Sequence, residues 1–236
     1  MNLDKQILSD ITIYTKYAKY LPEKERRETW DELVTRNRDM HIKTFPQLKE
    51  EITAIYRNFV YTKKVLPSMR SLQFGGKAIE LNNARIYNCA FLPIDSIHCF
   101  SETMFLLLGG TGVGYSVQNH HIDKLPEITK PNYNRNKRYV VQDSIIGWAD
   151  AIKTLFKSYT GYINSHIDFD LSDIRAKGAM LITAGGKAPG PEPLRIALVK
   201  IESILREKAP GTKLTDVECH DIQCHIADAV LAGGIR

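Results

Sequence analysis

The stretch GGTGVGYSVQ at residues 109–118 decides how the centre of this chain folds. Four glycines fall within six positions, and an alternating apolar stretch follows them. A P-loop is excluded, because Gly114 is followed by Tyr115 and Ser116 and not by the Lys-Ser/Thr pair that meets terminal phosphates and magnesium. A dinucleotide fingerprint needs a strand before its glycines and a helix after them, and here the order is reversed. Another kind of ligand is therefore expected beside this backbone.

The sequence on either side of the glycines predicts a βαβ unit. The run RIYNCAFL (85–92) is typical of a buried strand, and Ser96 is a candidate cap for the helix that follows. The glycines end that helix, as glycine commonly does, and Val113, Tyr115 and Val117 alternate like a second strand. If the two strands are parallel, Cys89 and Gly112 face one cavity, in which backbone without a side chain lets a sugar or phosphate come close.

The rest of the chain alternates helical and strand patterns, which indicates a mostly parallel sheet. Residues 1–66 read as a helical lead segment, with helical spacing clearest in EEITAIYRNFVY (50–61). Further helices are predicted at 145–159, at 193–207 and after Thr215, where TDVE has the form of a capping box. HIDFDLSD (166–173) predicts a strand, 130–138 an exposed loop, and the Gly/Pro-rich stretch 178–194 a structured loop or hairpin.

Composition excludes several classes of function. With 236 residues, of which 43% are hydrophobic and 25% charged, the chain has the composition of an ordinary globular protein of one or two domains. It has no apolar run near the roughly 20 residues of a membrane helix and no secretion signal. The net charge of +5 suits an anionic ligand such as a nucleotide, without the basic and aromatic blocks that direct nucleic-acid binding needs. A cytoplasmic protein with free thiols is expected.

The four cysteines offer two candidate sites. Cys89 lies in a strand, where a cysteine is more often a small buried hydrophobe than a nucleophile. The motif CHDIQCH (219–225) suggests zinc, but on a helix only His220 and Cys224 share a face, so four converging ligands are not expected and no metal is predicted. Asp95 lies in the turn after the first strand. Its ordinary role is to accept hydrogen bonds in the turn or at the helix cap, and the functional alternative is a hydrogen bond to a sugar hydroxyl or a base.

Taken together, the motifs resemble those of one enzyme family. They are NCAFLPIDS (88–96), GGTGVGYSVQ (109–118), DSIIGWADA (143–151), SDIRAKGAM (172–180) with AGGKAPGPEPL (184–194), and HDIQCHIADAVLAGGIR (220–236), with weaker matches at 26–41 and 66–76. Their order is similar to that in ribonucleotide reductases, especially the adenosylcobalamin-dependent (class II) ribonucleoside-triphosphate reductases. The VGYSVQ and GPEPL segments argue against a class I subunit with a di-iron partner.

The resemblance implies an α/β fold in which an N-terminal helical segment (1–66) precedes the first, incomplete half (67–236) of a ten-stranded α/β barrel. It implies thiyl-radical reduction of ribonucleoside triphosphates with adenosylcobalamin, whose contacts fall mostly in a missing C-terminal part. It also implies a deoxynucleotide effector and a thioredoxin-like reductant. Cys89 matches the first of two reducing cysteines, which a thiol suits because thiol exchange restores it.

The same resemblance assigns the binding residues. Asn88 and Gly112 match positions that contact substrate ribose or phosphate, and Ser68 is a weaker match for a phosphate donor. The effector-binding segment matches Asp95, Ser96 and Ile97.

The radical-bearing cysteine and the second reducing cysteine lie past the GGIR motif in the family. The sequence therefore predicts an N-terminal reductase piece that is inactive without a C-terminal reductase fragment. The alternative is a non-catalytic nucleotide-binding or regulatory module derived from a reductase. Because half a barrel leaves open strand edges, the isolated chain is expected to be poorly soluble.

Overall fold

The computed structural model describes residues 3–181 and 187–231. The chain forms two compact units, Met1–Tyr87 and Asn88–Arg236. The division into a lead segment 1–66 and a barrel part 67–236 stays a prediction. The boundary between the two compact units lies further along the chain, after Tyr87. The GGIR motif and part of the predicted loop or hairpin at 178–194 lie outside the described residues.

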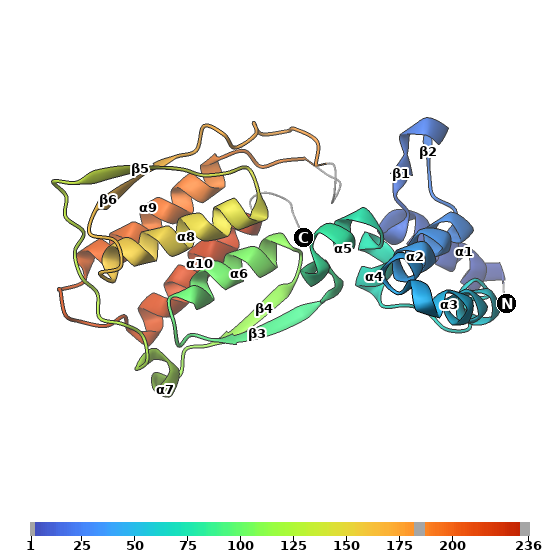
Figure 1. The fold of residues 1–236 in the computed structure, drawn as a ribbon, viewed down its shortest axis with the longest axis horizontal. Helices are drawn as coiled ribbons and strands as arrows, with labels where there is room; N and C mark the ends of the chain where they lie inside the picture. The colour runs from blue at the N-terminus through green and yellow to red at the C-terminus, as the bar shows by residue number, and fades with distance from the viewer. Residues whose placement is uncertain (1–2, 182–186, 232–236) are drawn as a thin grey trace. The chain divides into compact units, whose positions relative to one another are not determined.

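The first unit is mainly helical (Figure 1). Its main elements are α1 (Leu3–Thr12), β1 (Tyr20–Leu21), β2 (Arg26–Arg27), α2 (Trp30–Thr44), α3 (Lys49–Ile55), α4 (Met69–Phe74) and α5 (Lys77–Leu81), with a π-helical continuation of α3 at Tyr56–Val60. The helical prediction for 50–61 is confirmed, whereas the short antiparallel pair β1–β2 was not predicted. A small core holds the unit together, formed by Leu33, Val34, Tyr56, Val60 and Leu72.

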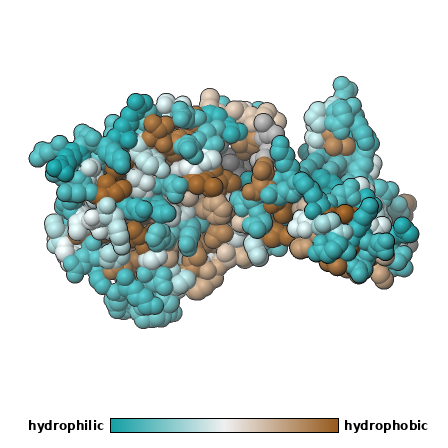
Figure 2. All heavy atoms as spheres, in the orientation of Figure 1, coloured by the Kyte–Doolittle hydropathy of each residue, from teal (hydrophilic) through white to brown (hydrophobic). Residues whose placement is uncertain are grey.

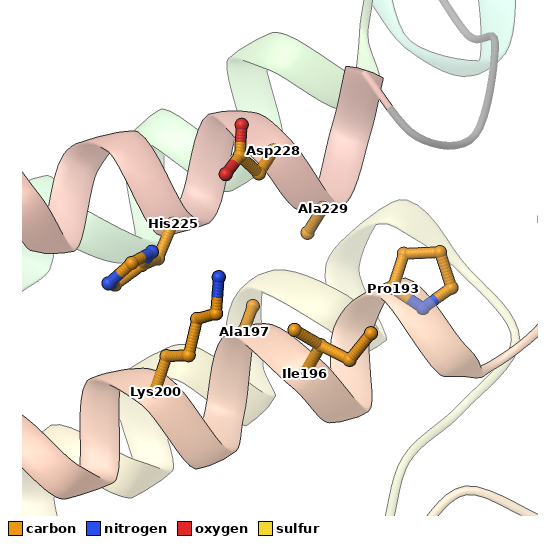
Figure 3. Close-up of a pocket in the computed structure, with 7 residues that line it drawn as sticks. All are labelled: Pro193, Ile196, Ala197, Lys200, His225, Asp228 and Ala229. Atoms are coloured by element: carbon orange, nitrogen blue, oxygen red, sulfur yellow. The ribbon is translucent and has the colours of Figure 1, made fainter.

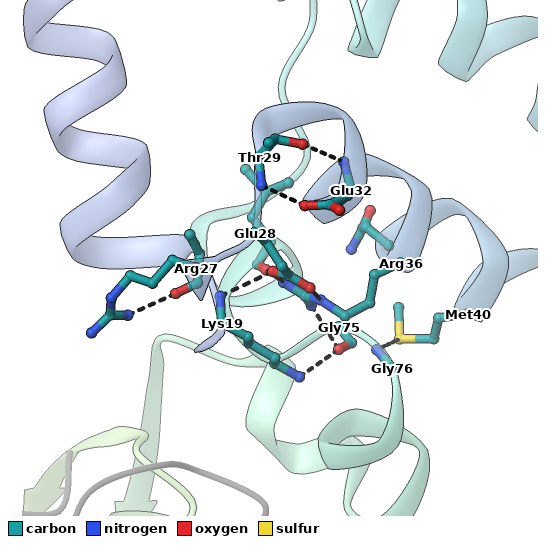
Figure 4. A network of polar contacts seen from close by, with 12 residues as sticks. Lys19, Arg27, Glu28, Thr29, Glu32, Arg36, Met40, Gly75 and Gly76 are labelled. Atoms are coloured by element: carbon teal, nitrogen blue, oxygen red, sulfur yellow. Dashed lines mark hydrogen bonds and ion pairs between the residues drawn. The ribbon is translucent and has the colours of Figure 1, made fainter. Parts of the chain in front are cut away.

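A buried ion pair fastens the hairpin of the first unit to α2 (Figure 4). The Arg36 guanidinium donates to both carboxylate oxygens of Glu28, at 2.7 and 2.8 Å, and the Glu28 side chain is only 5% exposed. Arg36 and Lys19 also donate to the Gly75 carbonyl, at 2.7 and 3.0 Å. Two cations therefore meet the C-terminal end of α4, where the helix dipole is negative.

The second unit contains the predicted βαβ unit and a layer of helices. Its elements are β3 (Cys89–Pro93), α6 (His98–Leu108), β4 (Gly112–Ser116), α7 (Asn119–Ile122), β5 (Asn136–Val140), α8 (Ile145–Tyr159), β6 (His166–Asp170), α9 (Glu192–Glu207) and α10 (Asp216–Leu231). β3 pairs with β4 and β5 with β6, both in parallel. In Figure 1, α6, α8, α9 and α10 run side by side between the two strand pairs.

The glycines of the motif end α6 in the way the sequence predicts. Gly110 has φ +92°, the left-handed conformation that glycine adopts without strain. The Thr111 amide donates to the Leu106 carbonyl and the Gly110 amide to the Leu107 carbonyl, which is the Schellman arrangement of a helix end. The chain thereby turns directly into β4 at Gly112, so the helix-to-strand order read from the sequence is confirmed.

The core of the second unit lies between its helices. The rings of Phe100 on α6 and Phe156 on α8 stack with centroids 4.3 Å apart and an interplanar angle of 3°. The predicted helix 145–159 is confirmed, and its Ser144 hydroxyl accepts the Gly147 amide at its start. The capping box before α10 is also confirmed, since Thr215 and Glu218 exchange hydrogen bonds between side chain and backbone.

Three local predictions were wrong. The first strand begins at Cys89 and not at residue 85, because residues Asn83–Ile86 form a 3₁₀ turn. It was also predicted to be buried, but its Cys89 and Phe91 side chains are exposed. Ser96 does not cap α6, whose N-cap is Ile97. Part of the predicted loop 130–138 belongs to β5, which pairs with β6 despite its polar sequence.

Candidate functional site

The exposed face of the β3–β4 pair brings the predicted site residues together. Cys89 and Gly112 are register partners, and Phe91 and Gly114 are partners two residues further along. Because side chains alternate along a strand, these four residues share one face, which is the exposed one. The Cys89 thiol therefore stands beside bare backbone, and Phe91, 66% exposed, stands beside the second glycine.

Nothing in the described fold requires glycine at 112 or 114. A Cβ added to Gly112 would lie 3.6 Å from the Asn88 carbonyl oxygen, and one on Gly114 would lie 3.9 Å from the Ala90 oxygen, both ordinary contact distances. At Gly147, by contrast, a Cβ would lie 2.3 Å from the Gln142 oxygen. Gly112 and Gly114 also lack the positive φ of Gly110. The two glycines thus keep a surface flat and open, as close approach of a ligand would demand.

Asn88 precedes this face and helps to hold it. Its carbonyl accepts a hydrogen bond of 2.9 Å from the Gly112 amide, which fixes the start of β4 against the start of β3. The Asn88 residue is exposed, as are Cys89 and Gly112. A thiol and an open strip of backbone therefore lie together at the beginnings of two parallel strands, directly after the exposed residue Asn88.

The predicted effector segment lies in the turn between β3 and α6. Asp95 and Ser96 are partly exposed, whereas the Ile97 side chain is 6% exposed and packs in the core. The buried Cys99 thiol holds the turn: it donates to the Pro93 carbonyl at 2.9 Å and lies 3.7 Å from a carboxylate oxygen of Asp95. Contacts with a ligand would fall to the Asp95 and Ser96 side chains.

Ser68 lies in the other compact unit. It is the N-cap of α4, and its hydroxyl accepts a hydrogen bond of 3.2 Å from the Ser71 amide. This capping contact gives Ser68 an ordinary structural role in addition to the predicted phosphate contact.

A cavity of about 340 Å³ lies between α9 and α10, away from the predicted site (Figure 3). In Figure 3 the Lys200 side chain extends from α9 toward α10, between His225 and Asp228. The His225 Nδ1 atom is buried and has no hydrogen-bond partner among the described residues. The sequence did not predict this cavity.

The motif CHDIQCH forms a pair of contacting side chains. Cys224 Sγ lies 3.6 Å from His220 Nε2, so the prediction that these two share a helix face is confirmed. Within residues 3–181 and 187–231, no group of three or more His, Cys, Asp or Glu side chains is placed to hold a metal ion. Sequence reasoning missed that Tyr115 joins this pair from β4, because residues 115 and 220 are far apart in the chain.

Apolar side chains reach the surface of the second unit at several places. Figure 2 shows apolar patches, in brown, among hydrophilic residues on the visible face. The exposed large apolar residues of the unit include Phe91, Val140, Ile146, Ile196 and Val199. None of the helices in the described part of the chain is both long and apolar enough to cross a membrane.

Comparisons with known proteins agree with the motifs. No family model matches the chain. The adenosylcobalamin-dependent ribonucleoside-triphosphate reductase of Lactobacillus delbrueckii subsp. bulgaricus is 30% identical over 292 residues, which covers 96% of this chain and 39% of that protein. The reductase of the same name from Lactobacillus helveticus is 27% identical over 296 residues, covering 96% of this chain and 40% of that protein.

A solved structure gives the same result in three dimensions. The crystal structure of a B12-dependent (class II) ribonucleotide reductase superposes with a TM-score of 0.82 at 27% identity, covering 94% of this chain and 40% of that one. The predicted fold class, a helical segment followed by part of a reductase-type α/β barrel, is thereby confirmed. The chain spans about two fifths of the length of the relatives it matches. Along nearly its whole length, the chain is similar in sequence and structure to part of the adenosylcobalamin-dependent, class II ribonucleotide reductases.

Proposed function

We propose that the chain is part of a ribonucleotide reductase that converts ribonucleoside triphosphates to deoxyribonucleotides, and that the β3–β4 face is its ribose-binding wall. The observation that carries the proposal is the register of Cys89 with Gly112 on an exposed face. A thiol beside open backbone can touch a sugar from the side, with no side chain of the facing strand in between.

Cys89 acts as one of two reducing thiols. Loss of the ribose 2′ hydroxyl as water requires two electrons, which two thiols supply when they become one disulfide. Cys89 provides one sulfur, and a second cysteine on the C-terminal reductase fragment provides the other. Exposure suits this role, because a reductant of the thioredoxin kind must reach the disulfide to restore it by thiol exchange.

The neighbouring residues bind the substrate. The Asn88 amide and the Gly112 backbone contact the ribose or a phosphate, and Ser68 is the weaker candidate for a phosphate donor. The Asp95–Ser96–Ile97 turn binds a deoxynucleotide effector, with Asp95 and Ser96 supplying the side-chain contacts because Ile97 is buried.

Adenosylcobalamin is the cofactor that the relatives require, and this chain would supply only part of its site. The cavities described here have volumes of about 340, 410 and 720 Å³, and none of these three is lined by residues of β3 or β4. We therefore expect the cofactor to be held mainly by the C-terminal reductase fragment that this chain needs as a partner. The exposed apolar residues of the second unit are the surface that such a fragment would cover.

The test is reconstitution. The chain is produced with and without the remaining reductase polypeptide, and deoxyribonucleotide formation from ATP, CTP, GTP and UTP is measured with thioredoxin, with and without adenosylcobalamin. We expect product only when both polypeptides and the cofactor are present. Deoxynucleotide binding by the chain, with no reconstituted activity, would instead indicate a regulatory module.

A further inference from the structure

A second group of reactive side chains lies on the face of β4 opposite to Cys89. Tyr115 reaches from β4 to α10, where its hydroxyl oxygen lies 2.6 Å from His220 Nδ1. The other ring nitrogen of His220, Nε2, lies 3.6 Å from Cys224 Sγ. The three side chains form a continuous series of contacts that ends in an exposed thiol.

This arrangement has the parts of an activated nucleophile. Such a site needs a nucleophile within hydrogen-bond reach of a base, and a third group that orients the base. Cys224 is the thiol, and His220 lies one helical turn before it on the same face of α10. Tyr115 contacts the far side of the imidazole and fixes its orientation from another element.

The protonation of Tyr115 is compatible with this use of the imidazole. Burial, followed by the proximity of Cys224 and of Asp221, raises the pKa of the Tyr115 hydroxyl. Tyr115 is therefore neutral near pH 7, and its oxygen can accept a hydrogen bond from Nδ1–H of a neutral His220. In that tautomer Nε2 is the unprotonated nitrogen, and it faces the Cys224 thiol.

We propose that Cys224 is a modification site that undergoes thiol–disulfide exchange with a low-molecular-weight disulfide, with His220 as its base and Tyr115 as the positioning residue. In the step, Nε2 takes the thiol proton while Sγ attacks one sulfur of the disulfide. The original S–S bond breaks, a mixed disulfide forms at Cys224, and the leaving thiolate takes the proton. The Cys224 sulfur is oxidised and the leaving sulfur is reduced, so no further reactant is needed.

The modification would act on the strand that carries the candidate ribose wall. A group attached to Cys224 competes with His220 for the space beside it, and His220 holds Tyr115 of β4. Gly112 and Gly114 lie on the same strand. The exchange itself does not depend on the proposed reductase function, because it needs only the three side chains.

The chain offers its own controls. Cys89 and Cys224 are exposed, whereas Cys99 and Cys219 are buried. In the C89S variant, Cys224 is therefore the single exposed thiol among the four cysteine positions. In this background the reaction with 2-hydroxyethyl disulfide is followed by intact mass and peptide mapping. Variants H220Q and Y115F test the base and the positioning residue. H225Q, on the same helix, is the matched control, and circular dichroism checks the fold of each variant.

We expect H220Q to slow modification of Cys224 by about a hundredfold, the lower end of what a general base contributes, and Y115F to slow it by a smaller factor. H225Q should react like its parent, and Cys89 in a C224S chain should be unaffected by H220Q. A folded H220Q variant whose Cys224 reacts within about twofold of the parent overturns the proposal, as does an equal loss in H225Q.

Discussion

The sharpest test of the candidate ribose wall is the substitution Gly112→Ala, because the structure separates its effect on folding from its effect on binding. The added Cβ lies 3.6 Å from the Asn88 oxygen and meets nothing closer in the described fold. The backbone there has no left-handed φ. Alanine should therefore raise the free energy of unfolding by about 0.4–1 kcal/mol, since it restricts the unfolded chain without straining the folded one.

Ligand binding should respond in the opposite direction. A sugar in contact with the bare backbone must move by about one C–C bond length, roughly 1.5 Å, to admit the methyl group. A loss of about 1.4–2.8 kcal/mol is a loss of about 10- to 100-fold in affinity. The assay is equilibrium binding of ribonucleoside triphosphate to the reconstituted reductase, with thermal denaturation of the chain measured in parallel.

Gly147→Ala is the matched control. Its Cβ would lie 2.3 Å from the Gln142 carbonyl oxygen, so the backbone at the start of α8 must shift, at a cost of about 1–3 kcal/mol. This variant should lose stability and keep its nucleotide affinity when folded. If Gly112→Ala binds nucleotide as tightly as the parent, or is destabilised as much as Gly147→Ala, the reasoning about an open ligand surface is wrong.

Three further predictions follow from named contacts. Cys89→Ser should abolish deoxyribonucleotide formation by the reconstituted enzyme while nucleotide affinity stays within about twofold, less than half a kcal/mol; residual turnover would show that another thiol reduces the substrate. Glu28→Gln should lower the free energy of unfolding by about 3 kcal/mol, because it removes the carboxylate partner of the partly buried Arg36 charge, whereas Glu80→Gln at the exposed Lys43 pair should change it by less than about 1 kcal/mol. Equal effects in urea denaturation would contradict this. Burial, then the Arg36 charge, lowers the pKa of Lys19 from 10.5 to about 8 in the folded chain. The unfolded state therefore binds the extra proton between these values, stability should rise with pH across that window, and Lys19→Met should reduce the slope measured by chemical denaturation.

Local patterns in the sequence predicted much of the second unit. The helix-to-strand order around the glycines, the helix at 145–159 and the Thr215 capping box each depend on residues within a few positions of one another, and each is confirmed. The pairing of Cys89 with Gly112 also agrees with expectation, because a short βαβ unit leaves its strands parallel and adjacent.

The features that the sequence did not predict depend mainly on contacts between residues far apart in the chain. β5 has exposed, polar residues at most positions, so its sequence resembles a loop, and only pairing with β6 some thirty residues later makes it a strand. Cys89 and Phe91 are apolar in type but exposed, so composition alone indicated a buried strand. Tyr115 and His220 come together across 105 residues, which no local pattern reveals.

Helix α6 connects the two parts of the candidate site, the turn at Asp95–Ile97 and the start of β4. Its C-terminal end meets β4 at the candidate ribose wall, where the helix dipole is negative and favours hydroxyl donors over phosphates. Its N-terminal end follows Asp95 and Ser96, where amide donors and the positive end of the dipole favour an anionic group. With 11 residues, α6 is about 16 Å long. Packing against α8 and α10 restrains it as a rigid body, through the Phe100–Phe156 stack among other contacts. A nucleotide phosphate bound at the turn and a ribose bound at the wall would therefore act on the two ends of one helix.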